Sequence, residues 1–225
     1  MGYVEVARSE RSHGELVLRE RRPEGGGPSV LELRANGAFV MDTSEHASER
    51  ALADAALELV ETPARVLVGG LGLGFTLDRV LGDPRVEQCD VVELEPALVG
   101  WMRDGTIPHG RRLLADRRVR VVVIDVASAV AEAAPASYDV VLLDVDNGPG
   151  YLVHEANAAL YRPPFLATVR ERLSPGGALA VWSADRAPEL LAGLRSAFDD
   201  AEELAHEVRL QDRDEHYWLY VGRRR

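Results

Sequence analysis

Short apolar runs that alternate with helical patterns constrain this 225-residue chain more than any other feature. Five runs rich in Val and Leu follow one another: Arg65–Val68, Cys89–Glu93, Val119–Ile124, Tyr138–Leu143 and Ala178–Trp182. Near-continuous hydrophobicity is typical of parallel strands that are covered on both faces. Helical patterns separate or follow the runs, at Leu77–Leu81, Pro96–Asp104, Ala127–Ala133, Leu160–Leu173 and Pro188–Phe198. The alternation predicts a doubly wound α/β fold.

The start of the chain has a different pattern. Glu15–Glu20 and Val30–Arg34 alternate apolar and polar residues, as half-buried strands do. Asn36-Gly37 then predicts a tight hairpin, because both residue types tolerate positive φ angles. We expect Thr43 or Ser44 to cap a helix that ends near Glu61.

The end of the chain predicts an antiparallel hairpin, from Glu203–Gln211 and Glu215–Val221. A parallel run finished by such a hairpin is the arrangement of class I methyltransferase-type folds. We therefore expect two parts. Residues 1–44 form a small antiparallel β unit, and residues 45–225 form a Rossmann-like catalytic domain with a mostly parallel seven-stranded sheet.

Composition excludes several classes of function. The net charge of −11 argues against nucleic acid as a partner, because phosphate contacts need Lys and Arg. All 26 basic residues are Arg, which excludes Schiff-base chemistry and a P-loop Lys. The single Cys89 excludes an internal disulfide and paired-thiolate metal sites, so no metal is expected. We see neither a signal peptide nor an apolar run of the ~20 residues that span a membrane, and expect a cytoplasmic protein.

A glycine-rich loop follows the first predicted parallel strand. The dinucleotide pattern G-x-G-x-x-G fails, because its third glycine position holds Phe75. The match is G-x-G-x-G, at Gly70, Gly72 and Gly74, which is typical of adenosylmethionine-binding loops. Such glycines let the backbone turn tightly and approach a ligand closely. A strand–helix turn with no ligand remains the alternative.

Acidic residues end the next two predicted strands. Glu93 lies ~20 residues past the glycine loop, where a carboxylate can accept hydrogen bonds from both ribose hydroxyls. Asp125 ends the third run, where an acid faces the exocyclic amine of adenine in this fold. Open α/β sheets bind ligands at these strand ends, so we interpret both acids as cofactor-binding residues rather than as solvated termini.

A polar segment, Asp144-Val145-Asp146-Asn147-Gly148-Pro149-Gly150, directly follows the fourth strand. Loops on rigid scaffolds commonly carry function, and this one lies where a transferred group would lie. The alternative is an ordinary turn, since Asp, Asn and Gly also favour turns. Trp182, at the end of the fifth run, fits either the pocket or the core.

In sequence the motifs read VLVGGLGLG, VVELEP, VVVIDV, YDVVLLDVDNGPG and ALYRPPFLATVRERLSPGGALAVW. This series resembles the spermidine synthase (polyamine aminopropyltransferase) family, in particular its short bacterial branch. The resemblance implies that Glu93 binds ribose and Asp125 the adenine amine. It also implies that Asp144 is the catalytic carboxylate that deprotonates the attacking amine, with Asp146 as its neighbouring rival. Glu45, Asn147 and Tyr151 are expected to contact the substrate, and a homodimer is expected.

Three positions depart from the family pattern. Spermidine synthases carry an Asp in the glycine loop, which holds the amine of an aminopropyl donor, and Leu73 replaces it here. Their preceding helix carries a Tyr and a polar partner, where this chain reads Glu45-His46-Ala47-Ser48-Glu49. Their second loop aspartate falls on Asn147, although Asp146 is adjacent. The adenosyl site therefore matches the family better than the substrate site does.

The expected function is group transfer from S-adenosylmethionine or its decarboxylated form to a small acceptor, a cationic amine. Leu73 favours methyl transfer, whereas Asp144 keeps aminopropyl transfer open. Two other functions remain: a non-catalytic adenosyl-nucleoside binder or scaffold, and a nicotinamide-dependent dehydrogenase, which the failed glycine pattern disfavours.

Overall fold

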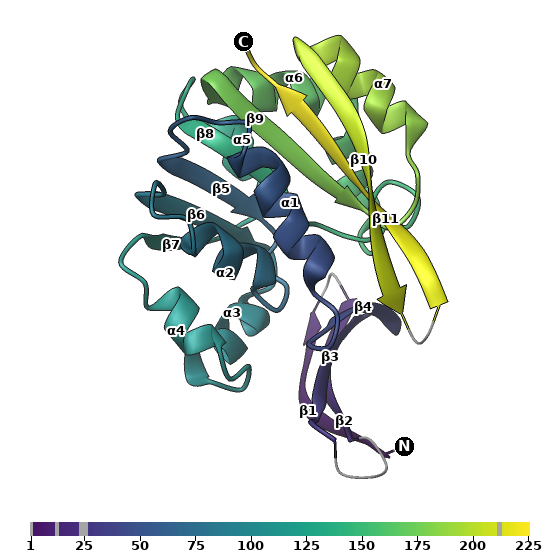
Figure 1. The fold of residues 1–225 in the computed structure, drawn as a ribbon. Coiled ribbons are helices and arrows are strands. Elements are labelled where there is room, and N and C mark those ends of the chain that lie inside the picture. The colour runs from purple at the N-terminus through teal and green to yellow at the C-terminus, as the bar shows by residue number, and fades with distance from the viewer. Residues whose placement is uncertain (1, 12–13, 23–26, 211–212) are drawn as a thin grey trace.

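The computed structural model describes residues 2–11, 14–22, 27–210 and 213–225, and its strands form two sheets (Figure 1). The larger sheet has the strand order β10-β11-β9-β8-β5-β6-β7. Strands β9, β8, β5, β6 and β7 are parallel, and β11 is antiparallel to β9 and β10. The strands are β5 (Arg65–Gly69), β6 (Gln88–Glu93), β7 (Val119–Val123), β8 (Tyr138–Leu143), β9 (Leu173–Ser183), β10 (Asp200–Leu210) and β11 (Arg213–Arg223). The predicted doubly wound, seven-stranded fold with its final hairpin is confirmed, although residues 211–212 of the hairpin lie outside the described residues.

Helices cover both faces of this sheet (Figure 1). They are α1 (Ala47–Leu57), α2 (Phe75–Leu81), α3 (Pro96–Asp104), α4 (Gly110–Leu114), α5 (Val126–Glu132), α6 (Pro163–Arg172) and α7 (Pro188–Ala197), with a 3₁₀ helix η1 (Glu155–Tyr161). Successive residues of β5 pack into opposite cores: Val66 lies in one cluster with Leu52 of α1, and Leu67 lies in another with Val169 of α6. Burial on both faces explains the unbroken apolar runs. Among the described residues, no helix is long and apolar enough to cross a membrane.

Strand order reverses at β5, which pairs with β6 on one side and with β8 on the other. Such a switch point opens a crevice beyond the carboxyl ends of the strands, where ligands of open α/β sheets bind. Backbone hydrogen bonds hold the loops there: Gly70 N donates to Val92 O at 2.8 Å, and Asp144 N donates to Gly69 O at 2.8 Å. The segments after β5, β6 and β8 therefore meet at one place.

The smaller sheet is antiparallel, in the order β1 (Gly2–Arg11), β2 (Gly14–Arg22), β3 (Val30–Ala35) and β4 (Ala38–Asp42). The hairpin predicted at Asn36-Gly37 is confirmed, with φ angles of 52° and 78°. Strand β1 was not predicted, because its charged side chains obscure the alternation. Leu18 and Leu33 lie in the same core cluster as Leu52, so the two sheets share a core. The division at residue 44 stays a prediction.

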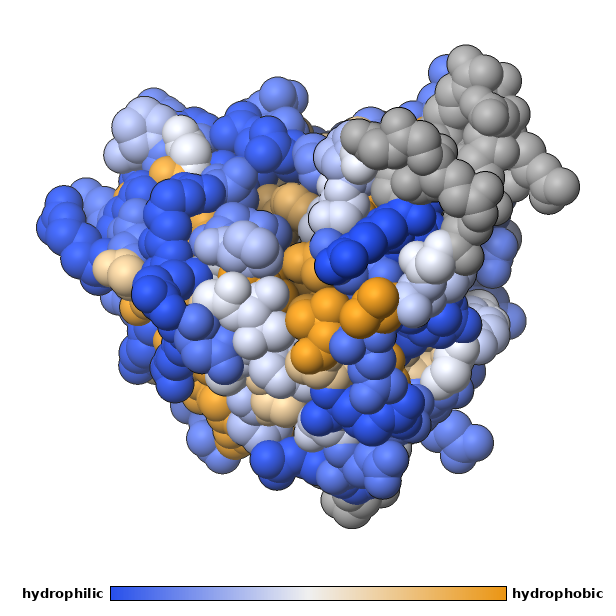
Figure 2. Space-filling view, turned by 90° about the horizontal axis from the view of Figure 1, so that it is seen from below, coloured by the Kyte–Doolittle hydropathy of each residue, from blue (hydrophilic) through white to orange (hydrophobic). Residues whose placement is uncertain are grey.

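The smaller sheet lies at the bottom of Figure 1, and Figure 2 views the molecule from that side. That face is mostly hydrophilic, with a group of hydrophobic side chains in its middle. Large hydrophobic side chains that the small sheet leaves exposed are Tyr3, Val4, Val6 and Phe39.

The predicted cap of α1 is wrong. His46 occupies the N-cap position, and the helix ends at Leu57 rather than near Glu61. The expected hydroxyls are used elsewhere: Ser44 Oγ donates to Asp42 Oδ1 at 2.6 Å, and Thr43 Oγ1 accepts from Leu31 N at 3.0 Å.

The helix predicted over Leu160–Leu173 is also shorter, since α6 begins at Pro163. Residues that precede proline are pushed out of the helical region, and Arg162 accordingly has φ −101° and ψ 151°. The chain before it forms η1 instead, and its Tyr161 hydroxyl donates to Val145 O at 2.8 Å. This contact helps to hold the loop after β8.

Candidate functional site

A first cavity lies at the switch point, between the carboxyl ends of the parallel strands and the smaller sheet. Four of its apolar wall residues come from the smaller sheet: Leu16, Leu33, Ala35 and Val40. The remaining lining residues are Gly70, Gly72, Val92, Glu93, Leu94, Glu95, Leu98, Ile124, Asp125, Val126, Asp144, Val145, Asp146, Val153, His154 and Asn157. An apolar wall with a few convergent polar groups is the usual composition of a small-molecule site.

Two of the three predicted glycines face this cavity. Gly70 (φ 92°) and Gly72 (φ 49°) line it, and both have backbone angles that side chains rarely adopt. A Cβ on Gly70 would lie 2.0 Å from Asp144 O, so only glycine lets the two loops approach this closely. Gly74 instead precedes α2 and faces Met102 and Leu113, away from the first cavity.

The Glu93 carboxylate joins the glycine loop to the loop after β6. Its Oε2 accepts from Leu71 N at 2.9 Å, and its Oε1 accepts from Glu95 N at 2.8 Å. Burial raises the pKa of Glu93, while these backbone hydrogen bonds favour its charged form. Each oxygen retains acceptor capacity at the cavity wall, so the carboxylate suits a pair of neighbouring hydroxyls.

Asp125 lines the same cavity one strand further along. It is the N-cap of α5, and its Oδ1 accepts from Ser128 N at 3.1 Å. The capping bond fixes the side chain and leaves Oδ2 as an acceptor. Glu93 and Asp125 therefore present carboxylates to one cavity from adjacent strand ends, an arrangement suited to a nucleoside.

A second cavity adjoins the first, and the two share Val40, Gly72, Asp144 and Asp146. Its other lining residues are Phe39, Met41, Asp42, Glu45, Ser48, Glu49, Asn147, Trp182 and Tyr217. Five acids thus surround it, and among the described residues that line it none is Arg, Lys or His. The Trp182 and Tyr217 ring centroids lie 4.7 Å apart in its wall. Carboxylates beside aromatic rings form a site for an organic cation.

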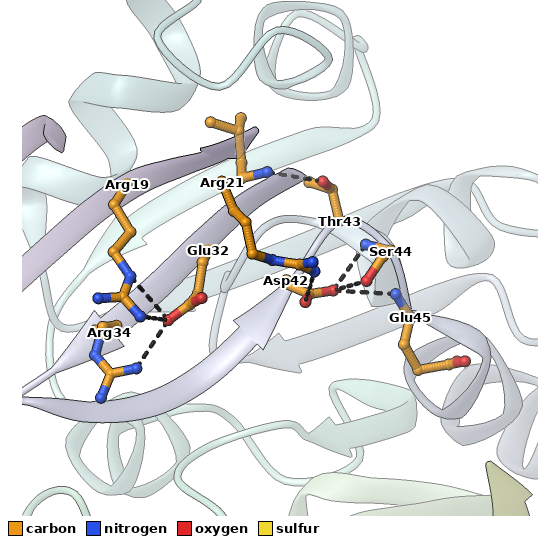
Figure 3. Close-up of polar contacts among 9 residues, drawn as sticks. Arg19, Arg21, Glu32, Arg34, Asp42, Thr43, Ser44 and Glu45 are labelled. Carbon is orange, nitrogen blue, oxygen red and sulfur yellow. Dashed lines mark hydrogen bonds and ion pairs between the residues drawn. The ribbon is translucent and has the colours of Figure 1, made fainter. Parts of the chain in front are cut away.

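Two of the five acids are largely compensated by their own surroundings (Figure 3). Asp42 Oδ1 accepts from Ser44 N at 2.7 Å and from Glu45 N at 3.1 Å, and its Oδ2 lies 3.6 Å from Arg21 Nη2. Glu45 Oε1 accepts from Ala47 N at 2.7 Å. These contacts shape the start of α1, so the negative charge directed into the second cavity comes mainly from the remaining three acids.

Asp144 lies where the two cavities meet, and a residue of helix α2 holds its side chain. Thr76 Oγ1 of α2 donates to Asp144 Oδ2 at 2.5 Å and lies 3.4 Å from Glu49 O of α1. Burial raises the pKa of Asp144 to about 6. Burial and the nearby Asp144 carboxylate raise the pKa of Glu49 to about 7. A carboxylate whose pKa lies near neutrality can accept a proton in a reaction.

The other residues predicted near the reaction centre, which are the catalytic candidate Asp146 and the substrate candidates Asn147 and Tyr151, fall into two groups. Asp146, with φ 54°, lines both cavities and accepts from Val153 N at 3.1 Å. Asn147 lines the second cavity, and its Nδ2 donates to Phe39 O at 3.4 Å. Tyr151, by contrast, is 52% exposed and lines neither cavity. Of the polar loop, residues 144–147 face the site.

Leu73 of the glycine loop is buried in the hydrophobic core and lines neither cavity. Its carbonyl oxygen lies 2.5 Å from His109 Nε2, so a histidine ring supports the loop from the opposite side. Position 73 accordingly offers no charge to a ligand in either cavity.

Sequence reasoning missed Asp42, Glu49 and Thr76 as site residues. Glu49 follows the candidate Glu45 by four residues, but Glu45 lies before the N-cap His46 of α1, so helical spacing does not identify Glu49. No local signal identifies Thr76, which reaches Asp144 across 68 positions of sequence.

Comparisons with known proteins agree with this geometry. Residues 45–190 match the family described as the spermine/spermidine synthase domain. Putrescine N-methyltransferase 3 of Nicotiana tabacum is 32% identical over 120 residues, which cover 52% of this chain and 29% of that protein. A polyamine aminopropyltransferase of Aeropyrum pernix is 28% identical over 182 residues, which cover 76% of this chain and 56% of that protein. The matched segments thus span less than two thirds of both relatives.

The fold has close relatives among solved structures. Spermidine synthase from Thermotoga maritima superimposes with a TM-score of 0.81 at 15% sequence identity, covering 98% of this chain and 72% of that one.

Proposed function

Because the chain belongs to the spermine/spermidine synthase domain family, we propose that it is a transferase that moves a methyl group from S-adenosylmethionine to a small cationic amine. The first cavity would hold the adenosyl part of the donor, and the second cavity would hold the amine. The names of its relatives support the amine as acceptor, since they include a putrescine N-methyltransferase and a polyamine aminopropyltransferase.

One observation carries this proposal: a nucleoside-type cavity and an acid-lined cavity meet at Asp144. Transfer between two substrates needs the reacting atoms to approach in line, and adjoining cavities supply that proximity. Because the two cavities share Gly72 and Asp144, an electrophilic carbon in the first cavity would lie beside an amine in the second.

The chemistry needs a base at this junction. An ammonium has no lone pair, so it must lose a proton before its nitrogen attacks carbon. Asp144 is placed to accept that proton, while Glu49 and Asp146 hold the cation in place. Glu93 and Asp125 would accept hydrogen bonds from the ribose and the adenine amine, and the sulfonium would supply the electrophilic carbon.

The lack of an acid at position 73 predicts which form of the donor binds more tightly. With no acid at this position, nothing in the glycine loop holds the amine of an aminopropyl donor. We expect S-adenosylmethionine to bind at least as tightly as its decarboxylated form, as measured by titration calorimetry with each. A clear preference for the decarboxylated compound would reverse the assignment in favour of aminopropyl transfer.

Aminopropyl transfer is the second candidate, because Asp144 and the acid-lined cavity serve either reaction. A Leu73→Asp variant is the matched test of this distinction. Because Leu73 is buried in the core and lines neither cavity, the aspartate should mainly destabilise the fold, and a gain in affinity for the decarboxylated donor would show that position 73 reaches the site.

The function itself is tested in two stages. Thermal-shift measurements with S-adenosylmethionine, its decarboxylated form, methylthioadenosine and NAD come first, because a ligand that binds only the native state raises the apparent stability. A panel of small amines is then incubated with the best donor, and the products are identified by mass. Stabilisation by an adenosyl compound without any product would support a non-catalytic binder, and stabilisation by NAD alone would support a dehydrogenase.

A homodimer remains a prediction from the family resemblance. The edge strand β1 leaves Val4 and Val6 exposed, which is consistent with burial against a second copy. Light scattering during size-exclusion chromatography should give twice the 24.6 kDa mass of the chain. A mass of one chain at micromolar concentration would contradict the prediction.

A further inference from the structure

Glu49 is a buried acid whose charge is poorly compensated. Glu49 is 8% exposed and lines the second cavity from helix α1. The side chain accepts a hydrogen bond from Ser48 Oγ to Oε2 at 2.8 Å, and it forms no ion pair within the part of the chain that the structure describes. A buried carboxylate without a cation is costly, so it tends to hold a proton or to bind a cationic ligand.

A second acid shares this environment. Thr76 Oγ1 lies 2.5 Å from Asp144 Oδ2 and 3.4 Å from Glu49 O, which ties the loop after β8 to helix α1. Both carboxylates face the second cavity. Two nearby carboxylates with little access to water cannot easily be ionised together, and one of them retains a proton.

We propose that Glu49 shares one proton with Asp144, and that this pair, rather than Asp144 alone, takes the proton of the incoming ammonium. The part of this inference that concerns the ammonium rests on the proposed function. Glu49 acts through Asp144 and through the charge of the cavity, and is therefore a positioning residue. The raised pKa values of both acids are consistent with the pairing.

Among the described residues that line the second cavity with Glu49, none is Arg, Lys or His. The titratable or polar residues around Glu49 are Asp42 of β4, Glu45 before α1, Ser48 of α1, Thr76 of α2, Asp144, Asp146 and Asn147 after β8, Trp182 of β9 and Tyr217 of β11. Glu45 adds to the negative potential and further raises the pKa of Glu49. The surroundings therefore favour a singly protonated pair until a cation enters.

The proton and electron changes balance in this scheme. Binding of the ammonium stabilises both carboxylates in their charged form, and the shared proton leaves for solvent. An N–H bond of the ammonium then breaks, and its proton passes to the pair. The freed lone pair of the nitrogen forms the new N–C bond as the C–S bond breaks. The electron pair of the C–S bond stays on sulfur and converts the sulfonium into a neutral thioether.

The pairing is tested first without any substrate, by thermal unfolding of Glu49→Gln. A group whose pKa is raised in the folded protein from its ordinary 4.5 to about 7 destabilises the fold increasingly as pH rises from about 4.5 to about 7, and by a constant amount above that pH. Gln cannot ionise, so the Tm of the variant should exceed that of the wild type by several degrees at pH 8.5. At pH 5 the Tm difference between the variant and the wild type should be only a small part of its value at pH 8.5.

Asp144→Asn supplies the test for sharing. In the Asp144→Asn background, Glu49→Gln should lose part of its pH-dependent Tm gain, because the neighbouring charge has already been removed whereas the burial of Glu49 remains. Glu45→Gln, made in both backgrounds, is the matched control, since Glu45 lines the same cavity but its carboxylate accepts from Ala47 N. An equal pH-dependent gain for Glu49→Gln in both backgrounds would overturn the pairing.

Proton release on binding of an amine tests the proposed role of Glu49 toward the ammonium. Calorimetric titration with 1,4-diaminobutane, in the presence of S-adenosylhomocysteine, is repeated at pH 6.5 in buffers that differ in ionisation enthalpy. Wild type should release a proton at pH 6.5 and much less at pH 8.5, whereas Glu49→Gln should release much less at both. Release at pH 6.5 that is unchanged in Glu49→Gln would overturn the proposed role of Glu49.

The two experiments separate this inference from the proposed function. If no amine binds or reacts, the proposed function fails, but the unfolding cycle still decides whether Glu49 and Asp144 share a proton. If amines react and the cycle shows no coupling, the pair is refuted and Asp144 acts alone.

Discussion

Asp144→Asn is expected to lose about 10²–10⁴-fold in turnover while donor affinity changes little, which is the range that positioned general bases contribute. The substitution is nearly isosteric, and the amide oxygen can still accept the hydrogen bond from Thr76 Oγ1. Because an amide is not a useful base, the loss should appear in the chemical step. Single-turnover kinetics and donor titration measure the two quantities separately.

Asp146→Asn is the matched control for this substitution. Asp146 lines both cavities and is two residues away, but one of its oxygens already accepts from Val153 N. The folded state of Asp144→Asn can be checked by its stability, because removal of a buried acid with a pKa of about 6 should raise Tm most above that pH. Normal turnover in Asp144→Asn together with loss in Asp146→Asn would place the base two residues further along.

Glu93→Ala is expected to weaken adenosyl-ligand binding by about 1.5–3 kcal/mol, the usual contribution of a hydrogen bond to a charged group. That corresponds to a rise in Kd of about 10–150-fold. The carboxylate also accepts from Leu71 N and Glu95 N, so its removal additionally loosens the glycine loop. Calorimetry with S-adenosylhomocysteine gives the affinity, and thermal unfolding without ligand gives the cost to the fold.

Glu93→Gln distinguishes the two contributions. It retains one side-chain oxygen as an acceptor but loses the charge, so it should keep more of the loop structure than Glu93→Ala while still binding the ligand less tightly. Unchanged affinity in both variants would show that Glu93 does not contact the ligand.

The parts of the fold predicted correctly are those in which local pattern and burial agree. Val66 and Leu67 face different cores, which is why β5 is apolar without interruption after Arg65. The predicted cap of α1 failed because both expected hydroxyls are bound elsewhere: Ser44 Oγ donates to Asp42 two residues earlier, and Thr43 Oγ1 accepts from Leu31 N of β3. The contact of Thr43 depends on the pairing of strands, which the local sequence does not reveal.

Only the part of the candidate site at the strand ends could be predicted from the sequence. Glu93, Asp125 and Asp144 follow strands whose ends must meet, so their positions along the sequence were informative. The acid-lined cavity depends on the packing of α1 and the smaller sheet against those strand ends. Glu49 and Asp42 could be recognised there only once that packing was known.

The residues that shape the first cavity and the residues that carry its polar groups lie in different parts of the chain. Leu16, Leu33, Ala35 and Val40 set the shape of the first cavity, whereas its carboxylates and glycines all lie between residues 70 and 146. Substitutions in the first 40 residues can therefore widen or narrow the cavity without altering a single polar group at the reaction centre. Divergence among such proteins can act on substrate selection and on catalytic power as two independently variable traits.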